Sequence, residues 1–157
     1  MRHGPAQDTA PTGRDEDRQL TAEGRERTRR VAEELRRREA YPSRILASPL
    51  RRCVQTAELV GSVLVPGVEL ELRRELAPGA GSSVVLAELM NARAGRVLII
   101  GHEPDLTQLT AGLLSNWSQG FDKAMVAALQ IDVGDWIGDR FAYPDAHLQF
   151  LIDPAEL

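Results

Sequence analysis

Apolar and polar positions along the chain form two kinds of segment, short apolar runs and longer stretches with helical spacing. The predicted strands are 44–48, 68–72, 96–101, 124–131 and 148–152. The predicted helices are 21–40, 49–60, 83–92 and 105–114. Through the middle of the chain the order is repeatedly strand then helix. This order favours a three-layer α/β/α sandwich in which a mostly parallel central sheet has helices on both faces.

The polar segment 5–19 precedes the first predicted helix and is rich in Asp, Thr, Pro and Gly. We interpret it as a long loop over a site. Asp8 and Asp15 in this loop can reach a neighbouring pocket, although acidic residues in loops are usually just solvated. Neither a repeat nor a biased linker divides the chain, so one domain is expected over residues 1–157.

The composition, 43% hydrophobic and 27% charged residues, is that of an ordinary globular protein. The formal net charge of −4 argues against a nucleic-acid binder, which neutralises phosphates with a basic surface. No apolar run approaches the ~18 residues that span a bilayer, and no secretory pattern opens the chain, so we expect a cytoplasmic protein without membrane contact. Cys53 is the single cysteine and is expected to pack within a helix.

Arginine and histidine residues stand where three segments are expected to meet at one edge of the sheet. Arg2 and His3 open the chain, and Arg52 and His102 each follow a predicted strand. Ligands of open α/β sheets bind beyond the carboxyl ends of strands, so these four side chains are expected to line one crevice. Guanidinium groups hold phosphate oxygens through paired hydrogen bonds, and an imidazole can attack phosphorus or donate to an oxygen. The four residues therefore predict a phosphoryl site in which arginine neutralises charge, with no metal and no cofactor.

Each of these signals is common by chance, but their combination is specific. Arg-His-Gly, then Ser-x-x-x-Arg-x-x-Gln-Thr, then a strand that ends in Gly-His occur here in one order and spacing. With these strings the chain resembles the histidine phosphatase superfamily, also called phosphoglycerate mutase-like, over nearly its whole length. The matching segments are Met-Arg-His-Gly at 1–4, Leu-Thr at 20–21 with Gly24, Ser-Pro-Leu-Arg-Arg-Cys-Val-Gln-Thr at 48–56 and Val-Leu-Ile-Ile-Gly-His-Glu-Pro-Asp-Leu at 97–106. The short length and the Gly-His-Glu-Pro-Asp-Leu string are most similar to the SixA-type phosphohistidine phosphatase branch.

The resemblance implies a phosphoric monoester or phosphohistidine hydrolase in which His3 attacks phosphorus and becomes phosphorylated. Arg2, Arg52 and His102 would hold the phosphoryl group while water hydrolyses the phosphohistidine. Glu75 stands near where larger members of the family carry an acid for the leaving group. Its role stays open between an acid or substrate contact and a solvated residue, because the SixA-type branch manages without a placed carboxylate.

The implied substrate is a phosphorylated protein, such as a His-phosphorylated signalling domain, because a chain without long insertions favours an open pocket. Two alternatives stay open at this point. One is a small-molecule phosphomonoesterase of the same superfamily, and the other is a phosphate-binding or interaction module with impaired catalysis. A mutase is less favoured, because the short chain leaves little room to grip the carboxylate of a phosphoglycerate.

The resemblance also implies a buried strand ahead of Arg-His-Gly, and the given sequence has only Met1 in that place. The first strand of the phosphoglycerate mutase-like sheet is therefore expected to be missing from residues 1–157. The apolar residues of a buried strand contribute roughly 1.5–3 kcal/mol each. We therefore expect that residues upstream of Met1, a different segment or a neighbouring chain fill the slot.

Overall fold

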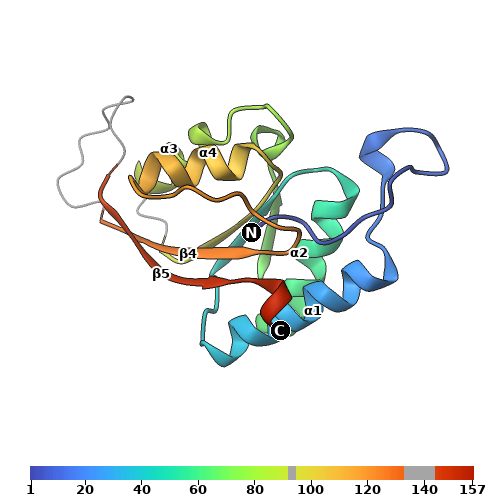
Figure 1. Cartoon of the computed structure of the whole chain (residues 1–157), viewed down its shortest axis with the longest axis horizontal. Helices are drawn as coiled ribbons and strands as arrows, with labels where there is room; N and C mark the ends of the chain where they lie inside the picture. The colour runs from blue at the N-terminus through green and yellow to red at the C-terminus, as the bar shows by residue number, and fades with distance from the viewer. Residues whose placement is uncertain (92–94, 133–143) are drawn as a thin grey trace.

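The structure is a computed structural model that describes residues 1–91, 95–132 and 144–157. Its helices and strands are α1 Ala22–Arg37, β1 Arg44–Ala47, α2 Arg51–Leu64, β2 Glu69–Leu72, α3 Ser83–Asn91, β3 Val97–Ile100, α4 Asp105–Leu113, β4 Val126–Ile131 and β5 Ala146–Ile152 (Figure 1). Short 3-10 helices add η1 Asp15–Asp17, η2 Arg74–Leu76 and η3 Pro154–Glu156. Each strand and helix expected from the sequence is present, with ends that differ by a few residues.

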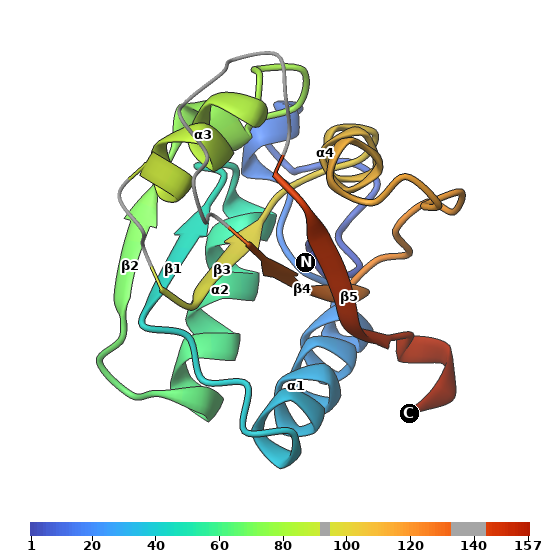
Figure 2. The same ribbon diagram turned by 90° about the vertical axis from the view of Figure 1, so that its left-hand side faces the viewer.

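The strands form two ladders that lie next to each other (Figure 2). β1 is central in a parallel sheet of order β2-β1-β3, so the carboxyl ends of these three strands meet at one edge. β4 and β5 pair antiparallel, with an irregularity between Ala128 and Leu129. Met1 and Arg2 lie between the ladders, where Arg2 forms a parallel bridge with Gly101 and its backbone N–H donates to the Met125 carbonyl over 3.1 Å.

Alternate side chains of the parallel sheet pack against different helices, which produces the three layers. Ile45 and Ile100 belong to the core cluster that includes buried residues of α1 and α2. Leu46 points the other way and packs with Val85 and Leu89 of α3. The α/β sandwich with a parallel central sheet and flanking helices is therefore confirmed.

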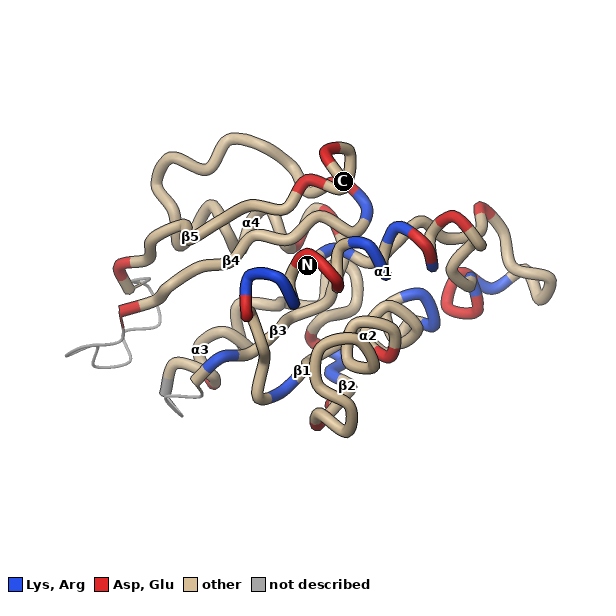
Figure 3. Tube along the Cα trace, turned by 90° about the horizontal axis from the view of Figure 1, so that it is seen from below, with Lys and Arg blue, Asp and Glu red and all other residues tan. Residues whose placement is uncertain are grey.

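Helix α1 begins where the sequence supplies a cap and ends before the chain turns into β1. The Thr21 hydroxyl accepts a hydrogen bond from the Gly24 N–H over 2.9 Å, which satisfies one of the free amides of the first turn. Its apolar side, with Val31 and Leu35, is buried, and its charged side faces solvent. Figure 3 shows this concentration of charge along α1, in contrast to β4 and β5. No helix among the described residues is long and apolar enough to cross a membrane.

Candidate active site

Backbone hydrogen bonds hold the Arg-His-Gly segment at the carboxyl edge of the parallel sheet. The His3 N–H donates to the Gly101 carbonyl over 3.2 Å, and the Gly4 N–H donates to the Thr56 hydroxyl over 3.1 Å. Gly4 is required at its position, because a Cβ there would lie 2.4 Å from the Thr28 Oγ1. The segment is thus tied both to the end of β3 and to the first turns of α2.

The hydrogen bonding of His3 fixes which ring nitrogen is available for chemistry. Its Nδ1 lies 2.8 Å from the Gly4 carbonyl oxygen, which can only accept, so Nδ1 carries the proton of the neutral ring. Nε2 then keeps its lone pair. Burial first, opposed by the Gly4 bond and assisted by the nearby His102, Arg52 and Arg2, lowers the pKa of His3 to about 3. His3 is therefore an uncharged base at neutral pH.

His102 faces His3 across the site, with 5.1 Å between the ring centroids. Its Nε2 lies 2.9 Å from the Ser48 Oγ and 3.4 Å from the Cys53 Sγ. Its Nδ1 has no hydrogen-bond partner in the part of the chain that the structure describes. Burial, followed by the charge of Arg52, lowers the pKa of His102 to about 4. Ser48 and Cys53 therefore hold the His102 ring at Nε2, and Nδ1 is available to a ligand.

Cys53 is a packing residue of α2, as the sequence predicts. Its side chain is fully buried, and burial raises the pKa of the thiol to about 12. The thiol stays protonated at neutral pH, and its Sγ contacts Nε2 of the His102 ring.

Two arginines bring positive charge to the histidine pair. Arg2 donates from NH1 to the Phe121 carbonyl over 2.7 Å. Arg52 is only 4% exposed, and its backbone carbonyl accepts a hydrogen bond from the Thr56 hydroxyl. The Nε of each arginine is buried and has no hydrogen-bond partner among residues 1–91, 95–132 and 144–157. An oxyanion would supply the acceptor that these buried donors lack.

The polar loop places a carboxylate on one of these arginines. Asp15 of η1 accepts from Arg52 twice, through its backbone carbonyl at 2.9 Å and its Oδ2 at 3.0 Å. Its Oδ1 accepts from Arg18 over 2.7 Å. Arg18 first, and then Arg52, hold the pKa of Asp15 below its usual value, so the side chain is an anion. The expectation that the loop 5–19 covers the site, with Asp15 in reach, agrees with this geometry.

Glu75 lies on η2 and pairs with a residue outside the arginine and histidine set. Its carboxylate is 3.3 Å from the Arg73 guanidinium. Its own backbone N–H first, and then Arg73, lower the pKa of this carboxyl. Within the described residues it makes no hydrogen bond to His3, His102, Arg2 or Arg52.

Gln55 and Gly24 stand in the motif strings of the sequence, but the contacts by which they support the site are seen only in the structure. Gln55 accepts the Leu20 N–H over 2.8 Å, which ties the end of the polar loop to α2. Gly24 leaves room for the chain after Gly4, because a Cβ there would lie 1.9 Å from the Pro5 carbonyl oxygen. The Phe121 carbonyl that accepts the hydrogen bond from Arg2 is a backbone group, so no pattern of residue types predicts this contact.

Comparison with known proteins identifies the family. Residues 1–80, about half of the chain, match the model of the histidine phosphatase superfamily (branch 1). The chain belongs to this superfamily. An uncharacterized protein of Picosynechococcus sp. is 37% identical over 109 residues, which are 68% of this chain and 66% of that protein. The phosphohistidine phosphatase SixA of Escherichia coli is 32% identical over 136 residues, 84% of this chain and 83% of SixA.

Two solved structures share the fold along nearly the whole chain. A protein histidine phosphatase SixA complexed with tungstate is 29% identical with a TM-score of 0.84, and the match covers 99% of this chain and 96% of that one. A mycobacterial glucosyl-3-phosphoglycerate phosphatase complexed with VO3 is 20% identical with a TM-score of 0.69, over 95% of each chain. At that identity the second match shows the common fold alone.

The donors and ring nitrogens of the site determine which chemistry it can perform. It combines one uncharged imidazole nitrogen, a second ring free at Nδ1 and two guanidinium groups with unused donors. No cluster of three or more His, Cys, Asp or Glu residues that could hold a metal ion occurs among the described residues. Such a site can bind a tetrahedral oxyanion and present a nitrogen nucleophile to it.

Proposed function

We propose that the protein is a metal-independent phosphatase that removes phosphoryl groups from phosphohistidine in proteins, through a phosphohistidine intermediate on His3. The observation that carries this proposal is the state of His3. Its Nδ1 is held by the Gly4 carbonyl, which leaves Nε2 as a nucleophile, and burial keeps the ring uncharged at neutral pH. Arg2 and Arg52 are close enough to lower the pKa of that ring.

In the first step, Nε2 of His3 attacks phosphorus in line, the P–N bond of the substrate breaks, and its imidazole leaves with the bonding electrons. The phosphorylated ring is an imidazolium, because Nδ1 keeps the proton that it donates to the Gly4 carbonyl. Water then attacks phosphorus, the P–Nε2 bond breaks, and inorganic phosphate leaves with the proton lost by water going to phosphate or solvent. His3 returns to its neutral form.

The other members of the set bind the phosphoryl oxygens. Arg2 and Arg52 stabilise the negative charge on the equatorial oxygens during both steps. A bound dianion raises the pKa of His102 by charge attraction, so that Nδ1 can donate a proton in a hydrogen bond to an oxygen. Arginine thereby supplies the positive charge that a divalent cation supplies in many other phosphatases.

The state of Glu75 favours phosphohistidine over an ordinary phosphoester. An alkoxide leaving group needs a proton donor, and Glu75 is held as an ionised partner of Arg73. The imidazole of phosphohistidine leaves without help when its second nitrogen is protonated. The relatives named phosphohistidine phosphatase SixA and protein histidine phosphatase SixA support the same substrate class.

The test is turnover of a phosphohistidine peptide in the presence of a metal chelator, with His3→Ala and the control His147→Ala. His147 lies on β5 opposite Gln130, toward the end of the ladder away from Met125, so its loss tests a histidine outside the site. We expect chelator-resistant turnover that falls by about 10³-fold or more in His3→Ala and stays unchanged in His147→Ala. Rapid quenching with labelled substrate is expected to trap an acid-labile phosphate on the peptide that contains His3. A label on another residue would contradict the mechanism.

The small-molecule alternative rests on the fold shared with a glucosyl-3-phosphoglycerate phosphatase. It predicts a higher kcat/KM for sugar phosphates than for the phosphohistidine peptide, together with a large loss in Glu75→Gln. Binding of phosphate without turnover of either class would indicate an impaired binding module.

A further inference from the structure

Glu103 stands next to His102 and holds the backbone of a residue that contacts Arg2. Its Oε1 accepts the Phe121 N–H over 2.9 Å, and its Oε2 accepts the Thr107 hydroxyl over 2.7 Å. Both oxygens of this carboxylate therefore have a defined partner, one on the connection after α4 and one on α4 itself. Neither step of the proposed mechanism uses this side chain.

Phe121 takes part in this arrangement with both polar groups of its backbone. Its N–H donates to Glu103, and its carbonyl accepts from NH1 of Arg2 over 2.7 Å. These two groups belong to neighbouring peptide planes that are joined at one Cα, so a rotation of the chain at Phe121 would move both hydrogen bonds. The position of the carbonyl that Arg2 contacts is therefore coupled to the carboxylate of Glu103.

Phe121 lies in the connection 114–125, which contains neither helix nor strand and joins α4 to β4 (Figure 2). Its ring is buried with Leu106 and Met125, and its centroid lies 5.3 Å from that of the Trp117 ring. Apolar packing is non-directional, so it holds the ring without setting the direction of the backbone carbonyl. A hydrogen bond is directional, and the bond to Glu103 therefore supplies the orientation that ring packing lacks.

The side chain of Arg2 depends on this carbonyl for its own orientation. With NH1 bonded to Phe121, Nε and NH2 remain for an oxyanion, and the buried Nε has no hydrogen-bond partner in the described part of the chain. Because a guanidinium group is planar, a fixed NH1 restricts the directions in which the other donors point. A displaced Phe121 carbonyl would therefore turn these donors away from the oxygens they are to bind.

We propose that Glu103 is a positioning residue for Arg2 that acts through the backbone of Phe121. The inference rests on the proposed function, which assigns Arg2 to the phosphoryl oxygens. It has a sign opposite to that of simple charge. Glu103 and phosphate are both negative, so repulsion alone would make phosphate bind more tightly when the carboxylate is removed. Positioning instead makes phosphate bind more weakly when the hydrogen bond to Phe121 is lost.

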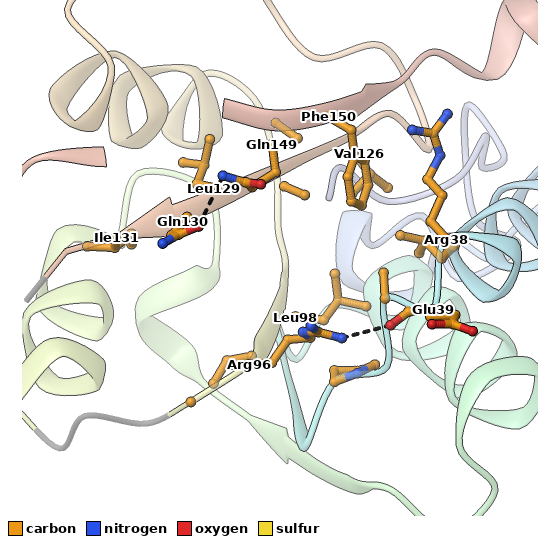
Figure 4. Close-up of a pocket in the computed structure, with 17 residues that line it drawn as sticks. Arg38, Glu39, Arg96, Leu98, Val126, Leu129, Gln130, Ile131, Gln149 and Phe150 are labelled. Atoms are coloured by element: carbon orange, nitrogen blue, oxygen red, sulfur yellow. Dashed lines mark hydrogen bonds between the residues drawn. The ribbon is translucent and has the colours of Figure 1, made fainter. Parts of the chain in front are cut away.

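Two substitutions separate the reach of this side chain from its charge. Glu103→Gln loses the charge but keeps an oxygen for the Phe121 N–H, and its amide nitrogen can donate to the Thr107 hydroxyl. Glu103→Asp keeps the charge but is one methylene shorter, so it cannot reach both partners. Glu39→Gln is the remote charge control. Figure 4 shows Glu39 at the opposite edge of the parallel sheet, where Arg96, directly before β3, donates to its backbone carbonyl over 2.7 Å.

The first readout is the Kd of inorganic phosphate, measured by calorimetric titration at constant ionic strength. Glu103→Asp is expected to weaken phosphate binding about 5- to 10-fold, whereas Glu103→Gln binds at least as tightly as the unsubstituted protein. Glu39→Gln is expected to leave Kd unchanged. Thr107→Val, which releases Oε2 and leaves Glu103 in place, is expected to weaken binding about twofold. It decides the question if Glu103→Asp does not fold.

The second readout is a double-mutant cycle with Arg2→Ala. If Glu103 acts through Arg2, adding Glu103→Asp to Arg2→Ala should change Kd by less than about 1.5-fold. The same loss of affinity with and without Arg2 would overturn the inference, because the carboxylate would then act on the site by another route.

The remaining outcomes separate this inference from the proposed function. Phosphate affinity in Glu103→Asp and Thr107→Val equal to that of the unsubstituted protein overturns the inference alone, and shows that packing of the Phe121 ring is sufficient. An unchanged Kd in Arg2→Ala removes Arg2 from the oxyanion site and overturns the inference together with that assignment. Neither readout requires turnover, so both stand whether or not His3 is the nucleophile.

Discussion

Replacement of Asp15 by alanine is expected to tighten the binding of inorganic phosphate. Its backbone and side chain occupy the NH1 and NH2 groups of Arg52 at 2.9 and 3.0 Å. These are the donors with which a guanidinium group grips an oxyanion. A phosphate that uses NH2 must first displace the Asp15 carboxylate, so the carboxylate competes with the ligand for one cation.

The size of the effect follows from the exposure of the two partners. Arg52 is nearly buried, whereas the Asp15 side chain is 59% exposed. Exposed ion pairs contribute about 0.2–1 kcal/mol, and hydrogen bonds to charged groups contribute about 1.5–3 kcal/mol. An intermediate cost of about 1–2 kcal/mol converts to roughly a 5- to 30-fold gain in phosphate affinity when the carboxylate is removed.

The assay is competitive inhibition by inorganic phosphate, supported by calorimetric titration at constant ionic strength. Asp17→Ala is the matched control, because Asp17 lies on the same 3-10 helix and pairs with Arg14 at 2.7 Å. Both variants lose one negative charge, but only Asp15→Ala frees NH2 of Arg52, while NH1 keeps its bond to the backbone carbonyl of residue 15. Equal gains in phosphate affinity in the two variants would show that the effect comes from the lost negative charge at long range and not from the contact with Arg52. Weaker phosphate binding in Asp15→Ala would refute the competition outright and indicate that Asp15 helps to build the site.

Three further predictions concern stability and positioning. Ser48→Ala removes the contact at Nε2 of His102 and is expected to lower kcat about tenfold with little change in KM. Ser48→Thr keeps a hydroxyl at this position and is expected to restore kcat. An unchanged kcat in Ser48→Ala would contradict a positioning role. Gly24→Ala forces a Cβ against the Pro5 carbonyl and is expected to lower the free energy of unfolding, measured in urea, by about 1–3 kcal/mol. In the control Gly13→Ala, the new Cβ meets no atom within 4 Å, so this variant tests the strain of a positive φ alone. His3 and His102 have lowered pKa values in the folded protein, so the unfolded chain binds more protons below about pH 6.5. The free energy of unfolding should therefore rise between pH 5 and 7, by up to about 2 kcal/mol per histidine, and a flat profile would contradict the burial of both rings.

The fold was predictable because its local signals agree with its packing. The apolar run at 96–101 becomes β3 and contributes to clusters on both faces of the sheet, as a buried parallel strand requires. Thr21 is the N-cap of α1, as its position before the helical pattern predicts. The end of α1 was predicted less well, because the helix stops at Arg37 and Glu39 adopts a positive φ of 54° before Tyr41-Pro42 is reached.

The meeting of Arg2, His3, Arg52 and His102 was predictable because each follows a strand end or opens the chain at the same edge of the sheet. Their partners were not, because they depend on the path of loops. The contact of Asp15 with Arg52 requires η1 to fold back over α2, and the sequence alone left Asp8 and Asp15 equivalent. The contact between Arg2 and the Phe121 carbonyl uses a backbone group, whose position no side-chain pattern encodes.

The two halves of the candidate site differ in how firmly the described chain supports them. Arg52 is on the first turn of α2, and His102 lies two residues after the buried end of β3, so both rest on elements packed into the core. Arg2 and His3 instead depend on a short segment held by backbone bonds to Ile99, Gly101 and Met125. Binding of an oxyanion draws on Arg52 and His102 as well as on Arg2, whereas nucleophilic attack requires His3 within a fraction of an ångström of its productive position. Loosening of the segment should therefore reduce catalysis before it reduces phosphate binding.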